Sequence, residues 1–202
     1  TSQRTAQAVH HVRLVTAGTL LEGQPHGMRQ KVRELFETRG IALMENVEIA
    51  KIGASEIVSA DGEHYPSDAT ILATGPVPQG WLARTGLDLV DGSIAIGPTL
   101  QSISDPDIFA TGDCATLVER PQLKSGVSAV RAGAILAQNL RLRAENQQLR
   151  MWRPPARQLM LLTTGDQRAF ASWGAFWWAG KWVWRLKRRI DRRWVRRFTI
   201  FS

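Results

Sequence analysis

The stretch Ile103-Ser-Asp-Pro-Asp-Ile-Phe-Ala-Thr-Gly-Asp-Cys114 decides the fold prediction for this chain. Its apolar residues 108–110 predict a short strand that ends at a glycine and a carboxylate, Gly112 and Asp113. Open α/β sheets bind their ligands at the carboxyl ends of strands. Gly112 lets a ligand approach the backbone, and Asp113 can accept hydrogen bonds from a ribose or polyol hydroxyl. The stretch therefore predicts a ligand site rather than a piece of core.

A helix is predicted shortly after this stretch, over residues 127–143. Ser125-Gly126-Val127 begins it, and apolar residues then recur at helical spacing, at Val127, Val130, Ala134, Ile135, Ala137 and Leu140. The first turn of a helix has unpaired N–H groups and carries the positive end of the helix dipole. We expect these groups to stabilise an electron-rich ring bound nearby.

Two motifs in the expected order resemble the FAD-dependent pyridine nucleotide-disulfide oxidoreductase superfamily of two-dinucleotide-binding-domain flavoproteins. The second FAD fingerprint of that superfamily is a threonine followed by an apolar strand ending in Gly-Asp, and residues 99–113 match it. Its crossover between domains is an apolar strand ending in Ala-Thr-Gly with a proline nearby, and Thr70-Ile-Leu-Ala-Thr-Gly-Pro76 matches that. The resemblance implies an α/β, FAD/NAD(P)-binding Rossmann-like fold that binds FAD and NAD(P)H.

The resemblance also implies which residues contact the cofactor. They follow the two matched strands or begin the predicted helix: Thr74, Gly75, Gly112, Asp113, Lys124, Ser125, Gly126 and Val127. Two of them have simpler interpretations. Lys124 either neutralises negative charge at the N1/C2 carbonyl side of a reduced flavin or is an exposed loop lysine. Asp113 either binds cofactor or is a turn or helix-capping aspartate.

Within the superfamily the chain looks most like type II NADH dehydrogenases, and in particular like the flavoprotein module associated with selenophosphate synthase (selenide, water dikinase). Residues 123–131 and 182–198 carry this narrower resemblance. It implies hydride transfer from NAD(P)H to FAD and electron transfer to a quinone or similar acceptor, with no catalytic side chain required. The alternative is a non-catalytic or regulatory flavin-binding module that partners selenophosphate synthase.

The first 74 residues predict the C-terminal part of an NAD(P)-binding domain. Residues 1–10 are expected to be the end of a helix, and a second helix is expected over 28–39, with Gly40 as its stop signal. The expected strands are a buried parallel strand at 12–16, short strands at 41–44, 47–49 and 56–58, a return through 64–65 after Asp61-Gly62, and a strand at 69–73. Residues 75–150 are then expected to form the second half of an FAD-binding domain.

No Gly-x-Gly-x-x-Gly follows a strand, although the superfamily has one for each dinucleotide, and the first residue is Thr1. We therefore expect a C-terminal fragment of a longer protein. An acid that binds the adenosine ribose usually ends the second strand of the NAD domain, where this chain has Thr16. Thr16 either contacts the ribose or simply ends the strand, so the choice between NADH and NADPH stays open.

The cysteine and histidine residues limit which redox and metal chemistry the sequence can support. The single cysteine, Cys114, cannot form an internal disulfide and does not supply the redox cysteines of sulfide:quinone reductases. The four histidines, His10, His11, His26 and His64, show no metal-ligand spacing, and none lies in the C-terminal half, where glutathione-reductase-type enzymes use one. We expect no metal site, no transmembrane helix and a cytoplasmic location.

Residues 151–202 are expected to form a C-terminal hairpin and a basic amphipathic helix. Strands are predicted at 158–162 and 168–172, and a helix follows with Trp173, Trp177 and Trp178 crowding its start. Residues 171–202 hold nine Lys or Arg and one acid, so their net charge of +8 equals that of the whole chain. We expect the helix either to dock on the inner face of the cytoplasmic membrane or to pack its apolar stripe on the protein. Nucleic acid is not expected as a partner, because no binding module accompanies the charge.

Overall fold

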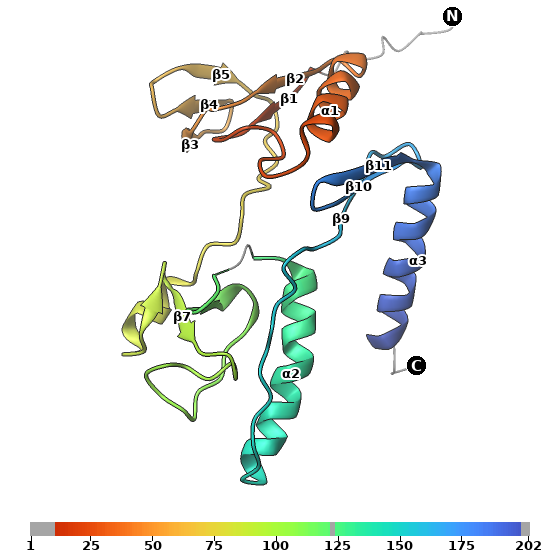
Figure 1. Cartoon of the computed structure of the whole chain (residues 1–202). Coiled ribbons are helices and arrows are strands. Elements are labelled where there is room, and N and C mark those ends of the chain that lie inside the picture. Colours follow the sequence, from red (N-terminus) through yellow and green to blue (C-terminus); the bar gives the residue numbers. More distant parts are fainter. Residues whose placement is uncertain (1–10, 122–123, 199–202) are drawn as a thin grey trace, which may run out of the picture. The chain divides into compact units, whose positions relative to one another are not determined.

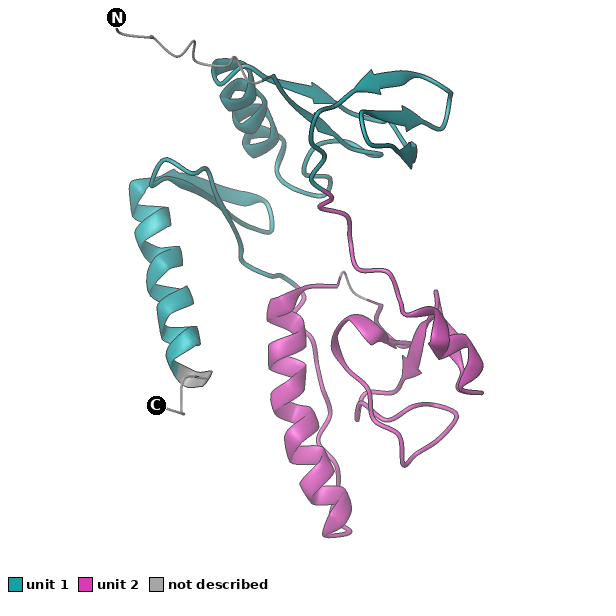
Figure 2. Cartoon of the chain, turned by 180° about the vertical axis from the view of Figure 1, so that it is seen from behind, with its two compact units in different colours: residues 1–71, 157–202 teal, residues 72–156 magenta. Residues whose placement is uncertain are grey.

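The computed structural model describes residues 11–121 and 124–198. The chain divides into two compact units: residues 1–71 with 157–202 form unit 1, and residues 72–156 form unit 2 (Figure 2). The helix end predicted within residues 1–10, and residue 123 of the narrower resemblance, lie outside the described residues.

Unit 1 begins with a strand, a helix and a parallel strand (Figure 1): β1 (Val12–Val15), α1 (His26–Thr38) and β2 (Ile41–Met44). The predicted strand and its parallel pairing are confirmed, with Val12 opposite Ile41. The prediction that this strand is buried is wrong, because Val12 and Leu14 are 53% and 39% exposed. Its apolar composition fits burial on both faces, but among the described strands only β2 pairs with it.

Helix α1 forms where the apolar spacing predicts it. Met28 and Val32, one turn apart, are both buried, so the helix presents one apolar face to the core. The helix ends at Thr38, and Gly40 follows its C-cap with a φ of +65°, a left-handed conformation that glycine adopts at little cost. The Gly40 N–H bonds the Glu37 carbonyl at 3.0 Å, which satisfies one of the carbonyls at the helix end.

A three-stranded antiparallel meander follows: β3 (Ile49–Ile52), β4 (Glu56–Ser59) and β5 (His64–Pro66). The predicted turn at Asp61-Gly62 is present, and Gly62 has a φ of +92°. Ser59 stabilises it by accepting the Glu63 N–H at 3.0 Å. The strand predicted at 47–49 lies two to three residues later, because Val47 instead bonds back to Thr16 at the end of β1.

The C-terminal segment of unit 1 forms a three-stranded sheet and a helix: β9 (Met160–Thr163), β10 (Ala169–Trp173), β11 (Phe176–Gly180) and α3 (Lys181–Phe198). The predicted hairpin and helix are confirmed. The third strand was not predicted, and it places Trp177 and Trp178 in β11 rather than at the start of the helix. Gly174, at φ +60°, makes the tight β10–β11 turn possible.

The two halves of unit 1 share one core, formed by Leu20, Met28, Val32 and Phe170. Trp177 packs on this core, and its ring lies 6.3 Å from that of Phe170. A Cβ on Gly27 would meet the Trp177 Nε1 at 3.0 Å, so glycine permits the close approach of α1 to β11. The C-terminal segment is therefore an integral part of the N-terminal unit.

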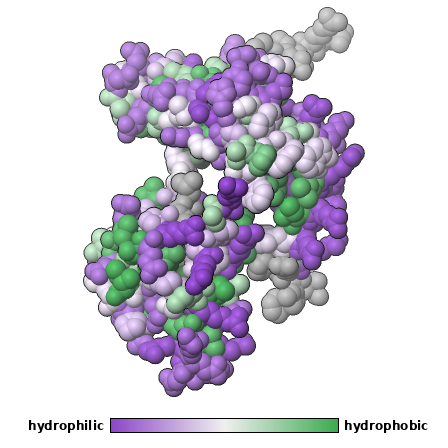
Figure 3. All heavy atoms as spheres, viewed as in Figure 1, coloured by the Kyte–Doolittle hydropathy of each residue, from purple (hydrophilic) through white to green (hydrophobic). Residues whose placement is uncertain are grey.

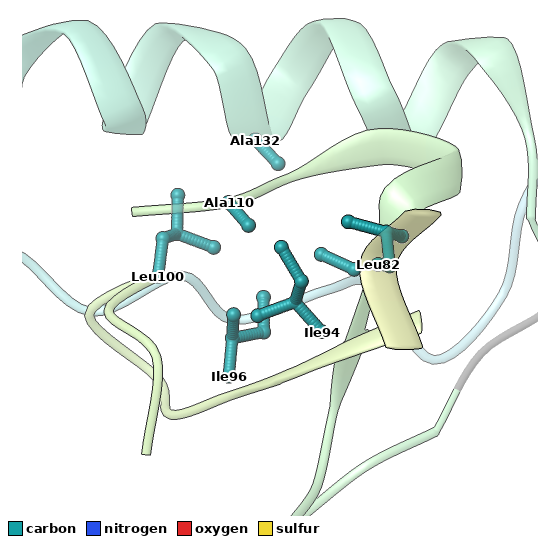
Figure 4. Close-up of a cluster of buried hydrophobic side chains, with 7 residues drawn as sticks. Leu82, Ile94, Ile96, Leu100, Ala110 and Ala132 are labelled. Atoms are coloured by element: carbon teal, nitrogen blue, oxygen red, sulfur yellow. The ribbon is translucent and has the colours of Figure 1, made fainter. Parts of the chain in front are cut away.

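Unit 2 packs helix α2 on short strands. Its elements are η1 (Gly80–Arg84), β6 (Leu89–Val90), β7 (Ser93–Ile96), η2 (Gly112–Cys114), β8 (Ala115–Leu117) and α2 (Gly126–Ala144). Strand β7 pairs antiparallel with β6 and parallel with β8. Figure 4 shows its core, in which Ala132 of α2 faces Ile94, Leu100 and Ala110. Leu82, Ile94 and Ile96 are buried in this core.

Two predicted strands do not form. Residues 69–73 are extended but pair with no described strand, and Ile71 and Leu72 are 92% and 66% exposed. An extended segment needs a neighbouring strand to satisfy its N–H and C=O groups. Residues 108–110 contribute only an isolated bridge from Phe109 to Gln101, because Ile108 is held in a turn by its bond to the Asp105 carbonyl at 3.3 Å.

Apolar side chains also reach the surface in both units, and Figure 3 shows green apolar patches between purple hydrophilic ones. On α2, Val127 and Leu140 are 53% and 50% exposed, whereas Ala132 and Asn139 are buried. The helix therefore uses only part of its apolar surface to cover unit 2.

Candidate functional site

The Gly112–Asp113 motif forms the turn η2, directly before β8. Thr111 is extended, and Gly112 then turns the chain with a φ of +73°, a conformation that other residues rarely adopt. A Cβ on Gly112 would contact the Ala129 methyl group at 3.5 Å, so the turn lies against the start of α2. The motif therefore precedes a strand instead of following one, and its conformation at Gly112 favours glycine.

Helix α2 brings its N-terminal turn to this motif. Ser125 is the N-cap, and its hydroxyl accepts the Ser128 N–H at 3.2 Å. Gly126 and Val127, the first helical residues, are exposed, and the first turn contains no acidic side chain. The positive end of the helix dipole is thus accessible beside Gly112 to an electron-rich or anionic group.

Asp113 offers a carboxylate at the same place. Its side chain is exposed and has no hydrogen-bond or ion-pair partner within residues 11–121 and 124–198. An ionised carboxylate accepts hydrogen bonds only, so it suits the hydroxyl groups of a ribose or ribityl chain. The capping alternative for Asp113 is not seen, because the cap of α2 is Ser125.

Lys124 is not the exposed loop lysine of the simpler interpretation. Its Nζ donates to the Ser93 Oγ at 3.2 Å, to the Thr116 Oγ1 at 3.1 Å and to the Ala115 carbonyl. An ammonium group has three donors, and all three are used here. Partial burial lowers the pKa of Lys124, while its electrostatic interactions with Asp113, Cys114 and Asp91 act in the opposite direction. Lys124 thus joins β7 to β8 and contributes positive charge to the site without a spare donor.

Thr74 and Gly75 are not held near the motif by any described bond. They lie in the extended segment after residue 71, and both are exposed. A Cβ on Gly75 would have no neighbour within 4 Å. The structure therefore brings together six of the eight predicted site residues and leaves these two apart.

Ser93, which contacts the site, and Asn139, which is buried elsewhere in unit 2, were not predicted. Ser93 is 1% exposed, and it accepts a hydrogen bond from Lys124 and donates to the Asp113 carbonyl at 3.5 Å. Asn139 is fully buried and donates to the Thr99 and Arg150 carbonyls at 2.8 and 2.9 Å. Its position seven residues after Ala132, on the same helix face, was a signal that a polar side chain faces the core.

A cavity of about 60 Å³ lies behind the turn. Gly112, Lys124 and Ser125 line one part of it, and Trp152 lines another. This volume holds roughly two water molecules and no aromatic ring system. A cofactor ring would therefore contact the outer surface of Gly112, Asp113 and the first turn of α2.

Cys114, which ends the same turn, and His64, which lies in the meander, each have a polar partner. Cys114 is exposed, and its thiol bonds the Thr111 carbonyl at 3.2 Å. His64 pairs with Glu56 at 3.0 Å in the meander. Within the described parts of the chain, no three His, Cys, Asp or Glu side chains are grouped to hold a metal ion, and no helix is long and apolar enough to cross a bilayer.

Parallel strand pairs packed with helices, and a glycine-aspartate turn beside the start of α2, are features of nucleotide-binding α/β proteins. A solved structure of similar fold is the sulfide:quinone oxidoreductase of Aquifex aeolicus, with a TM-score of 0.70 and 15% identity over 91% of this chain and 49% of that one. The pyridine nucleotide-disulphide oxidoreductase family model matches residues 1–133. The chain belongs to this family.

Named relatives match over shorter segments. An NADH oxidase of Methanocaldococcus jannaschii is 32% identical over 122 residues, which are 56% of this chain and 27% of that protein. A type II NADH:quinone oxidoreductase of Haemophilus influenzae is 29% identical over 116 residues, 54% of this chain and 25% of that protein. The chain thus covers about a quarter of the length of these two relatives.

Proposed function

We propose that this chain is part of an FAD-dependent NAD(P)H oxidoreductase of the NADH dehydrogenase type. The observation that carries the proposal is the exposed carboxylate of Asp113, which no described residue pairs with, beside Gly112 and the accessible first turn of α2. The names of the relatives, NADH oxidase and NADH:quinone oxidoreductase, support the same chemistry.

In the proposed enzyme, FAD supplies the hydride and electron chemistry when bound. Asp113 accepts hydrogen bonds from hydroxyl groups of the cofactor, and the N–H groups at the start of α2 face its electron-rich portion. Lys124 contributes a positive charge that is fixed in place by its three bonds. None of these residues is required as a nucleophile or as an acid-base group.

Flavin retention by variants of the full-length protein tests the role of Asp113. Asp113→Asn removes the charged acceptor, and we expect it to weaken flavin binding about 10-fold or more, since bonds to charged groups contribute about 1.5–3 kcal/mol. Asp88→Asn, an exposed aspartate in the same unit, is the control. Equal flavin affinity in the two variants would show that Asp113 does not contribute to flavin binding.

A quinone is the proposed electron acceptor. The relative from Haemophilus influenzae is named for this acceptor, and it supports the proposal. Turnover of NADH with a water-soluble quinone, compared with turnover with oxygen alone, is the direct test. A rate that quinone does not increase would argue for another acceptor.

We also propose that α3 docks on an anionic membrane surface. Three apolar residues at helical spacing, Leu186, Ile190 and Trp194, are 39%, 42% and 45% exposed, so part of this stripe lies at the surface. Another face of α3 carries arginine side chains, those of Arg185, Arg188, Arg189, Arg192, Arg193 and Arg196. Exposed aromatic side chains on the adjacent β10 and β11, Trp173, Phe176 and Trp178, add to the apolar surface.

A non-catalytic module that partners selenophosphate synthase is the second candidate. Its support is Thr16, which ends the β1 segment where an acid would bind the adenosine ribose. A flavin that binds but is not reduced by NADH or NADPH would favour this candidate over the dehydrogenase.

A further inference from the structure

A loop of residues 17–25 connects the carboxyl end of β1 to the start of α1. Two backbone bonds fix its beginning: the Asn46 N–H donates to the Gly18 carbonyl at 3.1 Å, and the Val47 N–H donates to the Thr16 carbonyl at 3.0 Å. The strand end and the loop are therefore held against the segment that follows β2.

The middle of the loop is anchored by Leu20. This residue is 7% exposed, its N–H donates to Glu45 at 2.5 Å, and its carbonyl accepts the Arg29 Nε at 2.9 Å. Glu45 also pairs with Arg33 at 2.8 Å. The Glu45 carboxylate thus already has two partners, the Leu20 N–H and the Arg33 guanidinium, and it holds the loop in place.

The end of the loop is anchored by Gln24. Its N–H bonds the Leu21 carbonyl at 3.0 Å, and its side chain accepts the Ser172 Oγ of β10 at 2.5 Å. Glu22 lies between these two anchors. The backbone that carries Glu22 is therefore fixed on both sides.

Glu22 turns its carboxylate back toward the strand end. Its Oε2 lies 3.1 Å from the position that a Cβ would take on Gly18, so the absence of a side chain at Gly18 makes room for it. Glu22 is exposed, and no described residue forms a hydrogen bond or ion pair with its carboxylate. A carboxylate acceptor with no partner among the described residues thus lies beside Gly18, two residues after Thr16, and it comes from Glu22 in the loop instead of from the strand.

Resting on the proposed NAD(P)H function, we infer that Glu22 is the specificity-determining residue for the adenosine ribose and that the site takes NADH in preference to NADPH. Ligands of α/β sheets bind outside the carboxyl ends of the strands, where this carboxylate lies. It can accept hydrogen bonds from the ribose hydroxyls. A 2′-phosphate at the same place would set like charges side by side, which disfavours its binding.

The test is the affinity of the full-length protein for ADP-ribose and for 2′-phospho-ADP-ribose, which probe the adenosine half without flavin chemistry. We expect the wild type to prefer ADP-ribose. Glu22→Gln should reduce this preference about 10-fold to 100-fold, since a bond to a charged group is worth about 1.5–3 kcal/mol. Gly18→Ala, which displaces the carboxylate, should give a smaller change in the same direction.

Thr16→Ala is the matched control and should leave the preference unchanged. An unaltered preference in Glu22→Gln, or a loss confined to Thr16→Ala, would overturn the inference while leaving the proposed function in place. Binding of neither probe by the wild type would instead contradict the NAD(P)H function itself. Thermal unfolding should be the same for wild type and Glu22→Gln, because the exposed carboxylate makes no described bond.

Discussion

The Ser172 hydroxyl donates to the Gln24 side-chain carbonyl at 2.5 Å, which joins β10 to the loop before α1 across 148 positions of sequence. Ser172 is 3% exposed, so water cannot readily replace its partner. This bond and the shared core of Phe170 and Met28 make the C-terminal sheet part of unit 1.

Removing that hydroxyl is expected to destabilise unit 1. Ser172→Ala leaves the Gln24 oxygen without its donor, and we expect a loss of about 1–2 kcal/mol in the free energy of unfolding. Urea unfolding measures it, with Ser55→Ala, at an exposed position, as the control. An equal effect of the two variants would show that the bond contributes nothing specific.

Lys124 is expected to stabilise unit 2 through its bonds to β7 and β8. Lys124→Met keeps most of the side-chain volume but removes the three donors to Ser93, Ala115 and Thr116, and we expect a loss of about 1–3 kcal/mol. Lys51→Met, on an exposed strand position of unit 1, should change stability little. If Lys124→Met is as stable as wild type, the bonds are dispensable and Lys124 acts only through its charge.

Glu45 gives a prediction about pH. Its bond with Arg33, and next its bond with the Leu20 N–H, lower its pKa in the folded chain. A carboxyl group with a lowered pKa contributes stability that is complete above its ordinary value of about 4.3 and is lost as the pH falls through the folded value. Glu45→Gln should therefore lose stability relative to wild type at pH 6 and less at pH 3, by urea midpoint. A stability difference between wild type and Glu45→Gln that increases as the pH falls would contradict the stabilising role of the ionised Glu45.

Vesicle flotation tests the membrane proposal for α3. The full-length protein should float with vesicles that contain phosphatidylglycerol at low salt and should be released at high salt, because headgroup attraction is screened. Arg192→Glu with Arg193→Glu should weaken binding about 30-fold or more, from about 1 kcal/mol for each cation. Lys51→Glu with Arg168→Glu makes the same charge change elsewhere in unit 1. Equal loss in both pairs, or no binding by wild type, would count against docking through α3.

Much of the fold follows from local sequence signals. Gly40 and Gly62 take the left-handed conformations that their turns require, and α1 and α2 follow their apolar spacing. The failed predictions concern pairing, which local patterns do not encode. Residues 69–73 have the composition of a strand but pair with no described neighbour, and β11 forms because a glycine turn lets an aromatic-rich segment pair with β10.

The site was predictable where one motif builds it and not where distant residues converge. Gly112, Asp113 and the start of α2 are close in sequence, and their grouping follows from a turn before a helix. Ser93 reaches Lys124 across 31 positions, and Glu22 becomes a candidate only because Gly18 and two anchored neighbours place its carboxylate. Such contacts depend on tertiary structure, which the sequence pattern alone does not contain.

The central claim is tested most directly by an anaerobic visible spectrum of the full-length protein, expressed with any residues that precede Thr1 in its gene, before and after addition of NADH. We expect a bound flavin whose absorption band is bleached by NADH, and a weaker band for Asp113→Asn than for Asp88→Asn. A protein that binds no flavin, or a flavin that neither NADH nor NADPH bleaches, would contradict the proposed oxidoreductase.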